Sequence, residues 1–345
     1  MAAERPAFID VDVWDRVAAM SLVEQVGQLV SYNVFGARKW TGHSLEELIA
    51  AGRVGTVLSI AVPNTPEPGT GGGDLERLQG IAARNGHPPL IHAGDFQRGV
   101  NVIGPSGFGA PNSWNGALIR SAAEKAARHM RIAGVTWSFS PVADAAVANL
   151  QGRSQEGGAV ESPKLMGDIA AMMVWGYQAE GQVAACVKHI GPYQYTYGPD
   201  YTVVPISRRA FHEDCWPRYE AGLKAGSLTA MMSFVDLDGE PSHASSYLAG
   251  LVREAGIPGV VVISDFTGIN ELIEFGVAAG PREAALLAFA EGGVHIDLNG
   301  GVYDLWLPRL VEEGEIARHD VMIRAAEVVQ LKKRLGLFEE PLRSG

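Results

Sequence analysis

Cysteine is scarce in this sequence, with Cys186 and Cys215 the only two among 345 residues. One lies in an apolar run and the other in a helical pattern, so they form neither a disulfide framework nor the paired spacing of a zinc site. Long apolar runs are also missing, because none approaches the roughly 18 residues of a membrane span. Hydrophobic residues still make up 47% of the chain. This combination predicts a soluble globular protein with a large core.

Basic residues are in short supply as well. The chain has 28 Lys and Arg against 39 Asp and Glu, and its formal net charge is -11. Nucleic acids and anionic membranes attract proteins through clustered Lys and Arg, and the sequence contains no such cluster. We therefore expect neither nucleic acid nor a membrane as a partner.

The first fourteen residues, Met1 to Trp14, contain no apolar segment and no small-residue cleavage site. They do not resemble a secretory signal peptide. Together with the two isolated cysteines, this favours a cytoplasmic location.

Short apolar runs alternate with amphipathic helical patterns along the chain. The runs predict strands at residues 55–62, 89–94, 135–141, 183–190, 228–234, 260–264 and 294–298, with a weaker one at 275–278. The patterns predict helices at 74–84, 118–133, 164–180, 208–225, 247–255, 281–291, 303–313 and 321–335. Six glycines stand where left-handed helix ends are expected: Gly134, Gly181, Gly226, Gly256, Gly292 and Gly314.

Repeated strand–helix units with buried strands indicate a parallel sheet. Their unbroken succession, without a single glycine-rich phosphate fingerprint, favours a closed barrel over a doubly wound sheet. We predict the α/β class and one TIM-type (β/α)8 barrel that spans residues 1–345, with no second domain.

Polar side chains stand at the ends of several predicted strands. Asp265 ends the run at 260–264, Asp95 follows 89–94, Lys188 and His189 end the run at 183–190, and Asp297 lies in 294–298. Because a barrel brings the carboxyl ends of its strands together, these groups are expected around one cavity, where they suit a polyhydroxylated ligand. The alternative is that each Asp caps the following helix, which the segment Asp297-Leu-Asn-Gly favours most for Asp297.

The segment Val262-Ile-Ser-Asp265-Phe266 resembles the Val-Val-Ser-Asp-Trp signature of glycoside hydrolase family 3, whose Asp is the catalytic nucleophile. Further segments are similar to motifs of this family and occur in its order. They are Met20-Ser-Leu-Val-Glu-Gln-Val-Gly-Gln, Pro89-Leu-Ile-His-Ala-Gly-Asp95, Gly152-Arg153 with Glu156, Lys188-His189, Gly198-Pro-Asp200-Tyr and Arg334-Leu-Gly-Leu-Phe-Glu-Glu-Pro341. The resemblance thus runs from residue 20 to residue 341.

The resemblance implies a retaining exo-glycosidase that acts on β-glucosides, β-xylosides or N-acetyl-β-glucosaminides and needs no metal or organic cofactor. Asp265 is then the nucleophile. Asp95, Arg153, Lys188 and His189 are expected to hold the sugar hydroxyls, and Met231 and Phe266 to line the substrate site. A loop ion pair is the alternative role for Arg153 and Glu156. Retention also requires a second carboxyl as acid, about 5 to 5.5 Å from the first.

The general acid is not evident in the sequence. In most β-glucosidases of this family it comes from a second domain, and this chain ends where that domain is expected to begin. The single-domain N-acetylglucosaminidases use a His-Asp pair after Lys-His, but residues 191–205 contain no His. The candidates within the chain are Glu156, Asp200, Asp236 and Asp238. A separate partner chain, or a homodimer, remains an open alternative.

Other positions depart from the family pattern. Phe266 replaces the Trp that follows the nucleophile, and the segment from Met231 to Gly239 lacks the first Asn of the family's Met-Ser-Ala-Tyr-Asn motif. Tyr193, Tyr195 and Tyr197 follow His189 in a predicted loop and are candidates for a wall around the leaving group.

Three functions follow as hypotheses. The first is a retaining β-glycosidase that acts on a small glycoside. The second is a repurposed barrel of small-molecule biosynthesis that uses Asp265 without net hydrolysis. The third is a non-catalytic sugar-binding subunit, which the presence of Asp265, Lys188 and His189 disfavours.

Overall fold

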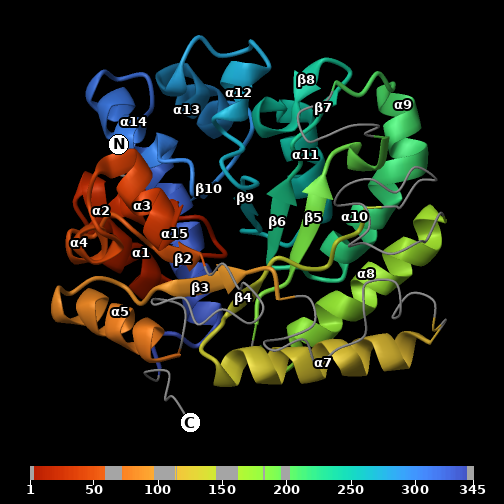
Figure 1. Cartoon of the computed structure of the whole chain (residues 1–345), viewed down its shortest axis with the longest axis horizontal. Coiled ribbons are helices and arrows are strands. Elements are labelled where there is room, and N and C mark those ends of the chain that lie inside the picture. The colour runs from red at the N-terminus through yellow and green to blue at the C-terminus, as the bar shows by residue number, and fades with distance from the viewer. Residues whose placement is uncertain are drawn as a thin grey trace.

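The strands lie at the centre of the molecule and helices surround them (Figure 1). The computed structural model describes residues 4–58, 72–96, 113, 115–144, 162–181, 183–195 and 203–339. Within these ranges, no helix is both long and apolar enough to cross a membrane.

Eight short strands of the described part of the chain run parallel. They are β1 (Val30–Tyr32), β2 (Thr56–Leu58), β3 (Ile91–Gly94), β4 (Trp137–Ser138), β5 (Cys186–Ile190), β6 (Thr229–Met232), β9 (Val261–Ile263) and β10 (Asp297–Leu298). Five of them pair in the order β10-β1-β2-β3-β4, which we call the large arc, and three in the order β5-β6-β9, which we call the small arc. β7 (Asp236–Leu237) and β8 (Glu240–Pro241) form a separate antiparallel hairpin.

Isolated parallel bridges join the two arcs at both seams. Trp137 of β4 bridges to Ala184 just before β5, and Ile263 of β9 bridges to Ile296 just before β10. Backbone hydrogen bonds support each seam, since Ser138 N donates to Ala184 O and Ser264 N donates to Ile296 O, both at 3.0 Å. The strands therefore follow one another around a ring, and the predicted barrel class is confirmed.

Apolar strand residues fill the ring. Val187, Val261 and Ile263 are all fully buried. Strands covered on both faces need apolar side chains throughout, which explains why these segments read as continuous apolar runs in the sequence.

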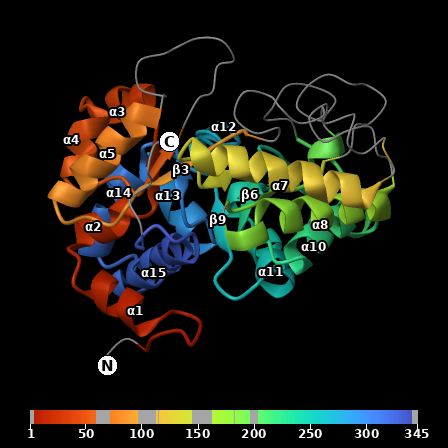
Figure 2. The same cartoon turned by 90° about the horizontal axis from the view of Figure 1, so that it is seen from below.

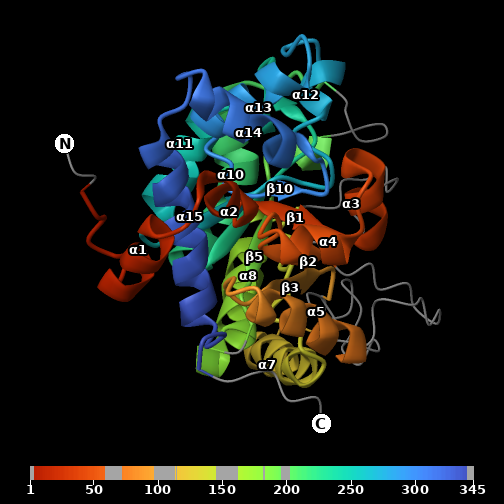
Figure 3. The same ribbon diagram turned by 90° about the vertical axis from the view of Figure 1, so that its left-hand side faces the viewer.

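Helices cover the ring on its outside. They are α1 (Val11–Ala18), α2 (Leu22–Gly27), α3 (Val34–Thr41), α4 (Leu45–Ala50), α5 (Gly72–Arg84), α7 (Gly116–Ile132), α8 (Pro163–Tyr177), α9 (Arg208–Ala210), α10 (Trp216–Lys224), α11 (Ser246–Ala255), α12 (Glu271–Glu274), α13 (Pro281–Ala290), α14 (Val302–Glu312) and α15 (Arg318–Arg334). α7, α8 and α10 pack side by side (Figure 2). At the other side, α1 packs against α15, so the first helix lies beside the last one (Figure 3).

Local sequence fixes several helix starts. Ser21 with Glu24 and Ser44 with Glu47 form capping boxes at α2 and α4. In each box the Ser side chain accepts the backbone N–H of the Glu, and the Glu side chain accepts the backbone N–H of the Ser. Ser162 caps α8, whose first residue is Pro163, a residue that suits the first turn because it has no N–H to satisfy.

Two details of the predicted elements are wrong. The eighth strand is β1, whereas residues 275–278 form a loop in which Val277 N and Ala278 N both donate to Leu272 O. Among the six glycines, Gly256 has an extended backbone, and at the end of α13 the left-handed residue is Gly293 rather than Gly292. The other four glycines have positive φ, as predicted.

Candidate active site

Charged side chains from three strands meet at one end of the ring. Asp95 follows β3, Lys188 and His189 lie in β5, and Asp265 follows β9. Lys188 Nζ donates to Asp95 Oδ1 at 2.5 Å, and His189 Nε2 lies 3.5 Å from Asp265 Oδ2. Barrel enzymes place their sites at the carboxyl ends of the strands, which is where these four residues lie.

Asp265 is held at the end of β9 by its backbone and its side chain. Asp265 is only 3% exposed. Its N–H donates to His243 Nε2 at 3.0 Å, and its carbonyl oxygen accepts from Gly268 N at 2.9 Å. Carboxylate Oδ1 accepts the N–H of Phe266 at 2.7 Å. The next helix, α12, begins only at Glu271, so Asp265 is not a helix cap.

His189 is oriented from behind by Asp144. Nδ1 of His189 lies 2.6 Å from Asp144 Oδ2, and both side chains are fully buried. A carboxylate accepts a hydrogen bond from the ring, so Nδ1 carries a proton and Nε2 is the nitrogen that faces Asp265. The ring of Tyr193 packs 5.1 Å from the His189 ring.

Tyr219 forms a hydrogen bond to the other oxygen of the Asp144 carboxylate. Its hydroxyl donates to Asp144 Oδ1 at 2.6 Å and lies 3.0 Å from the carbonyl oxygen of Gly191. Burial raises the pKa of Tyr219 well above its ordinary value, which keeps the hydroxyl a donor. Sequence reasoning missed Asp144, which lies three residues after the predicted strand at 135–141, whereas Asp95 and Asp265 follow their predicted strands directly.

Lys188 and Asp95 form an ion pair between a buried and an exposed side chain. The Lys188 side chain is 4% exposed and that of Asp95 is 64% exposed. Lys188 Nζ also lies 5.9 Å from the centre of the Phe139 ring. The pair therefore presents an accessible carboxylate that a buried ammonium group fixes in place.

Two other predicted site residues lie at the same end of the ring. Met231 is buried in β6, and Phe266 remains 38% exposed directly after Asp265. Asp297 takes the structural role that the sequence favoured, since its Oδ2 accepts the first N–H groups of α14, from Val302 at 2.7 Å and Tyr303 at 3.1 Å. Burial raises the pKa of Asp297 to about 6.

Asp236 is engaged in the β7–β8 hairpin. Its Oδ1 accepts from Val204 N at 2.6 Å and its Oδ2 from Gly239 N at 2.8 Å. Asp238 occupies the hairpin turn with φ of 55°. Both carboxylate oxygens of Asp236 thus accept backbone N–H groups. This argues against the predicted role of Asp236 as the general acid.

Several predicted residues lie outside the described residues, namely Arg153, Glu156, Tyr197 and Asp200. Of the tyrosines that were candidates for a wall around the leaving group, Tyr193 is buried beside His189, so this prediction is wrong for it. The hydroxyl of Tyr195 donates to Asp214 at 2.8 Å.

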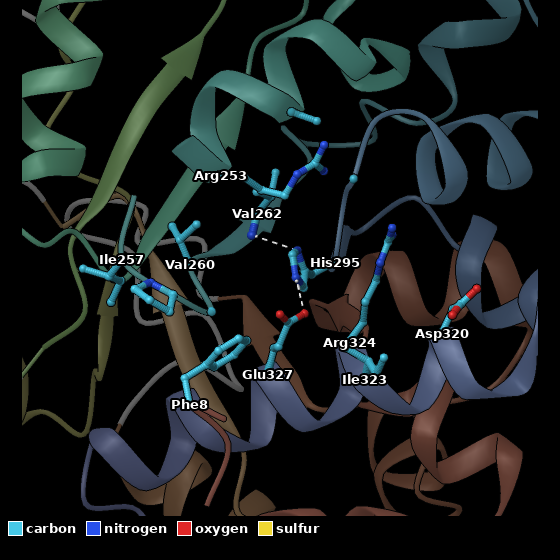
Figure 4. A pocket seen from close by; sticks show the side chains of 14 residues that line it. Phe8, Arg253, Ile257, Val260, Val262, His295, Asp320, Ile323, Arg324 and Glu327 are labelled. Carbon is cyan, nitrogen blue, oxygen red and sulfur yellow. Dashed lines mark hydrogen bonds and ion pairs between the residues drawn. The ribbon is translucent and has the colours of Figure 1, made fainter. Parts of the chain in front are cut away.

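A cavity of about 410 Å³ lies at the opposite end of β9 (Figure 4). His295 stands in it and connects the strand to α15, because its Nδ1 accepts from Val262 N at 3.1 Å and its Nε2 lies 2.8 Å from Glu327. None of Asp95, Asp144, Lys188, His189 and Asp265 lines this cavity, so it is separate from the site around Asp265.

Comparisons with known proteins place this arrangement in a family. Residues 21–331 match the model of the glycosyl hydrolase family 3 N terminal domain. A periplasmic β-glucosidase of Salmonella typhimurium is 27% identical over 97% of this chain and 43% of its own length. A putative β-xylosidase of Formosa agariphila is 29% identical over 73% of this chain and 35% of its own length.

Solved structures show the same similarity. The β-glucosidase from Listeria innocua in complex with glucose superposes with a TM-score of 0.85 at 28% identity, covering 97% of this chain and 48% of that one. The chain thus spans less than half the length of these relatives. With a family model matched over residues 21–331, the chain belongs to glycosyl hydrolase family 3, in the part that forms the family's N-terminal domain.

Proposed function

We propose that this barrel is a retaining exo-β-glycosidase that removes a terminal sugar from a small glycoside. The observation that carries the proposal is the buried Asp265 carboxylate, whose Oδ2 lies 3.5 Å from His189 at the carboxyl end of the ring. The family relatives with names of β-glucosidase and β-xylosidase support a β-glycoside as substrate.

Asp265 takes the part of the nucleophile. Its carboxylate oxygen bonds to the anomeric carbon while the bond to the leaving oxygen breaks and that oxygen receives a proton. Water then gives a proton to the conjugate base of the general acid and attacks the same carbon, the bond to Asp265 breaks, and the carboxylate is restored. Two inversions at one carbon leave the configuration retained.

The remaining polar residues suit sugar hydroxyls. The Asp95 carboxylate and Nε2 of His189 accept hydrogen bonds, and the Lys188 ammonium donates them. Because Lys188 Nζ donates a hydrogen bond to Asp95 Oδ1 at 2.5 Å, a sugar hydroxyl that reaches one of these groups also lies near the other. Arg153 joins this set on the strength of its family motif.

The general acid is proposed to come from a loop of this chain or from a partner chain. Asp236 is bound into its hairpin, which leaves Glu156, Asp200 and Asp238 as the candidates within the chain. A leaving group that departs without protonation removes the need for this acid in the first step.

The test is turnover of 2,4-dinitrophenyl β-glucoside, β-xyloside and N-acetyl-β-glucosaminide, followed by a matched activated fluorosugar. We expect release of the phenol, and a glycosyl adduct on the peptide that contains Asp265, detected by mass spectrometry. No release from any of the three substrates and no adduct would refute the proposed activity. An adduct on a different residue would refute the role of Asp265.

A further inference from the structure

A buried histidine holds the backbone of Asp265 from a different segment of the chain. His243 lies in the short turn of residues Ser242–Ala244 that follows the β7–β8 hairpin and precedes α11. It is 2% exposed, and its Nε2 accepts the N–H of Asp265 at 3.0 Å. The contact links the residue after β9 to a segment that is not a strand neighbour.

The position of this imidazole is built by close packing from two further segments. A Cβ atom on Gly268 would overlap the Nε2 and Cε1 atoms of His243, and one on Gly292 would overlap its carbonyl oxygen. Neither glycine has a positive φ, so the requirement at these positions is space rather than backbone conformation. Gly268 follows β9 and packs on the ring, and Gly292 precedes β10 and packs on the backbone, so His243 is fixed between these two segments.

The hydrogen bond from Asp265 N–H determines which nitrogen of the His243 ring carries the proton. A nitrogen that accepts an N–H has no proton of its own, so the neutral ring of His243 carries its proton on Nδ1. Burial, and secondarily the nearby His189, lowers the pKa of His243 to about 3. The acceptor is therefore available over the working range of a protein at neutral or mildly acidic pH.

We propose that His243 is a positioning residue that sets the direction of the Asp265 carboxylate by accepting the Asp265 N–H. This inference rests on the proposed nucleophilic role of Asp265. The side chain and the backbone nitrogen are bonded to the same Cα atom, so fixing the N–H restricts the rotation of the backbone that aims the carboxylate. With Oδ1 on the N–H of Phe266, the same restraint leaves Oδ2 directed towards His189.

The test compares His243→Gln with His243→Phe. The Gln side chain reaches about as far as Nε2 and offers an amide oxygen as acceptor, whereas Phe fills the space and offers none. We expect His243→Gln to stay within about fivefold of the parent in kcat/KM on an aryl glycoside, and His243→Phe to lose about 100-fold, the effect of misplacing a reacting group by about 1 Å. Glycosyl trapping on Asp265 should slow in parallel.

The matched control is His295, which lies just before β10. Its Nδ1 accepts the N–H of Val262 in β9 at 3.1 Å, and its ring lines the cavity of Figure 4 rather than the site around Asp265. His295→Phe removes that acceptor and is expected to lower stability without a comparable loss of kcat/KM. If His295→Phe loses as much activity as His243→Phe, or if His243→Gln is as impaired as His243→Phe, the positioning role is overturned.

A readout that does not need turnover separates this inference from the proposed function. Hydrogen–deuterium exchange of the peptide 262–268 is expected to quicken in His243→Phe and to be restored in His243→Gln. Should the parent protein show no glycosidase activity, the proposed function fails while exchange still decides whether His243 holds the Asp265 backbone. Unchanged exchange in His243→Phe overturns the inference in either case.

Discussion

At the residue scale, the two ring nitrogens of His189 have different partners, one that orients the ring and one that is the proposed nucleophile. Nδ1 meets Asp144 at 2.6 Å inside the protein, and Nε2 faces Asp265 at 3.5 Å. Tyr219 secures the second oxygen of Asp144. The orientation of one imidazole is therefore fixed by residues that do not themselves reach the mouth of the site.

Replacement of Asp144 by Asn is expected to reduce kcat by about 10- to 100-fold, or roughly 1.4 to 2.7 kcal/mol. The amide can turn its N–H₂ towards Nδ1, and this reverses which ring nitrogen carries the proton. The measurement is kcat on an aryl glycoside, with folding checked by circular dichroism. Asp168→Asn, at an exposed carboxylate on α8, is the control. Equal activity of the two variants would contradict the orienting role of Asp144.

Replacement of Asp265 by Asn keeps the size of the side chain and removes its charge. The covalent step should fail while the sugar still binds, so we expect kcat to fall about a thousandfold, or roughly 4 kcal/mol, with affinity for a sugar ligand nearly unchanged. Steady-state kinetics and calorimetric binding check the two parts. A variant with nearly full activity would show that Asp265 has a structural role only.

At the element scale, the outer helices depend on small residues where they approach each other. Gly176 of α8 lies against α7, and a Cβ there would meet Arg120 O at 2.6 Å. Gly167 of the same helix lies against α10, where a Cβ would meet Pro217 O at 3.0 Å. α8 is thus packed closely on both of its neighbours.

Gly176→Ala is expected to destabilise the protein by about 1 to 3 kcal/mol, because a backbone oxygen cannot move aside as a side chain can. Gly250→Ala in α11 is the matched control, since a Cβ there meets nothing within 4 Å. Removing a glycine from a helix interior with free space should stabilise by about 0.5 to 1 kcal/mol. Urea unfolding measures both variants, and a stabilised Gly176→Ala would contradict the packing argument.

Seven of the eight strands could be predicted from their apolar runs because buried parallel strands need apolar side chains throughout. β1 was missed because it begins three residues after α2 ends at Gly27, so its apolar residues extend the helical pattern. In the site, Asp95, Lys188, His189 and Asp265 could be predicted from strand ends. His243 could not, because it lies in a turn and meets Asp265 only through the folded loops.

At the scale of the whole molecule, two buried histidines link stability to pH. Burial lowers the pKa of His92 to about 4 and that of His243 to about 3. Both values lie below the roughly 6.5 of an unfolded histidine, so the unfolded chain binds protons first as the pH falls. Their contribution to stability is complete above about pH 6.5 and decreases towards pH 4.

Between pH 7 and pH 5 we expect the free energy of unfolding to fall by about 2 to 4 kcal/mol from these two groups together. His92→Gln should reduce this dependence, while His43→Gln should not, because the His43 side chain is 55% exposed. Urea titrations at the two pH values provide the measurement. An unaltered pH dependence in His92→Gln would show that His92 titrates in the folded protein as it does in the unfolded chain.

The pairing of β1 with β10 has a consequence for biosynthesis. Val30 aligns with Asp297, so the large arc contains strands from both ends of the chain. A ribosome releases residue 30 long before residue 297, so β1 can pair with β2 early while its other edge waits for β10. All three strands of the small arc, β5, β6 and β9, are made before β10. One edge of β1 is thus covered only after the small arc is available.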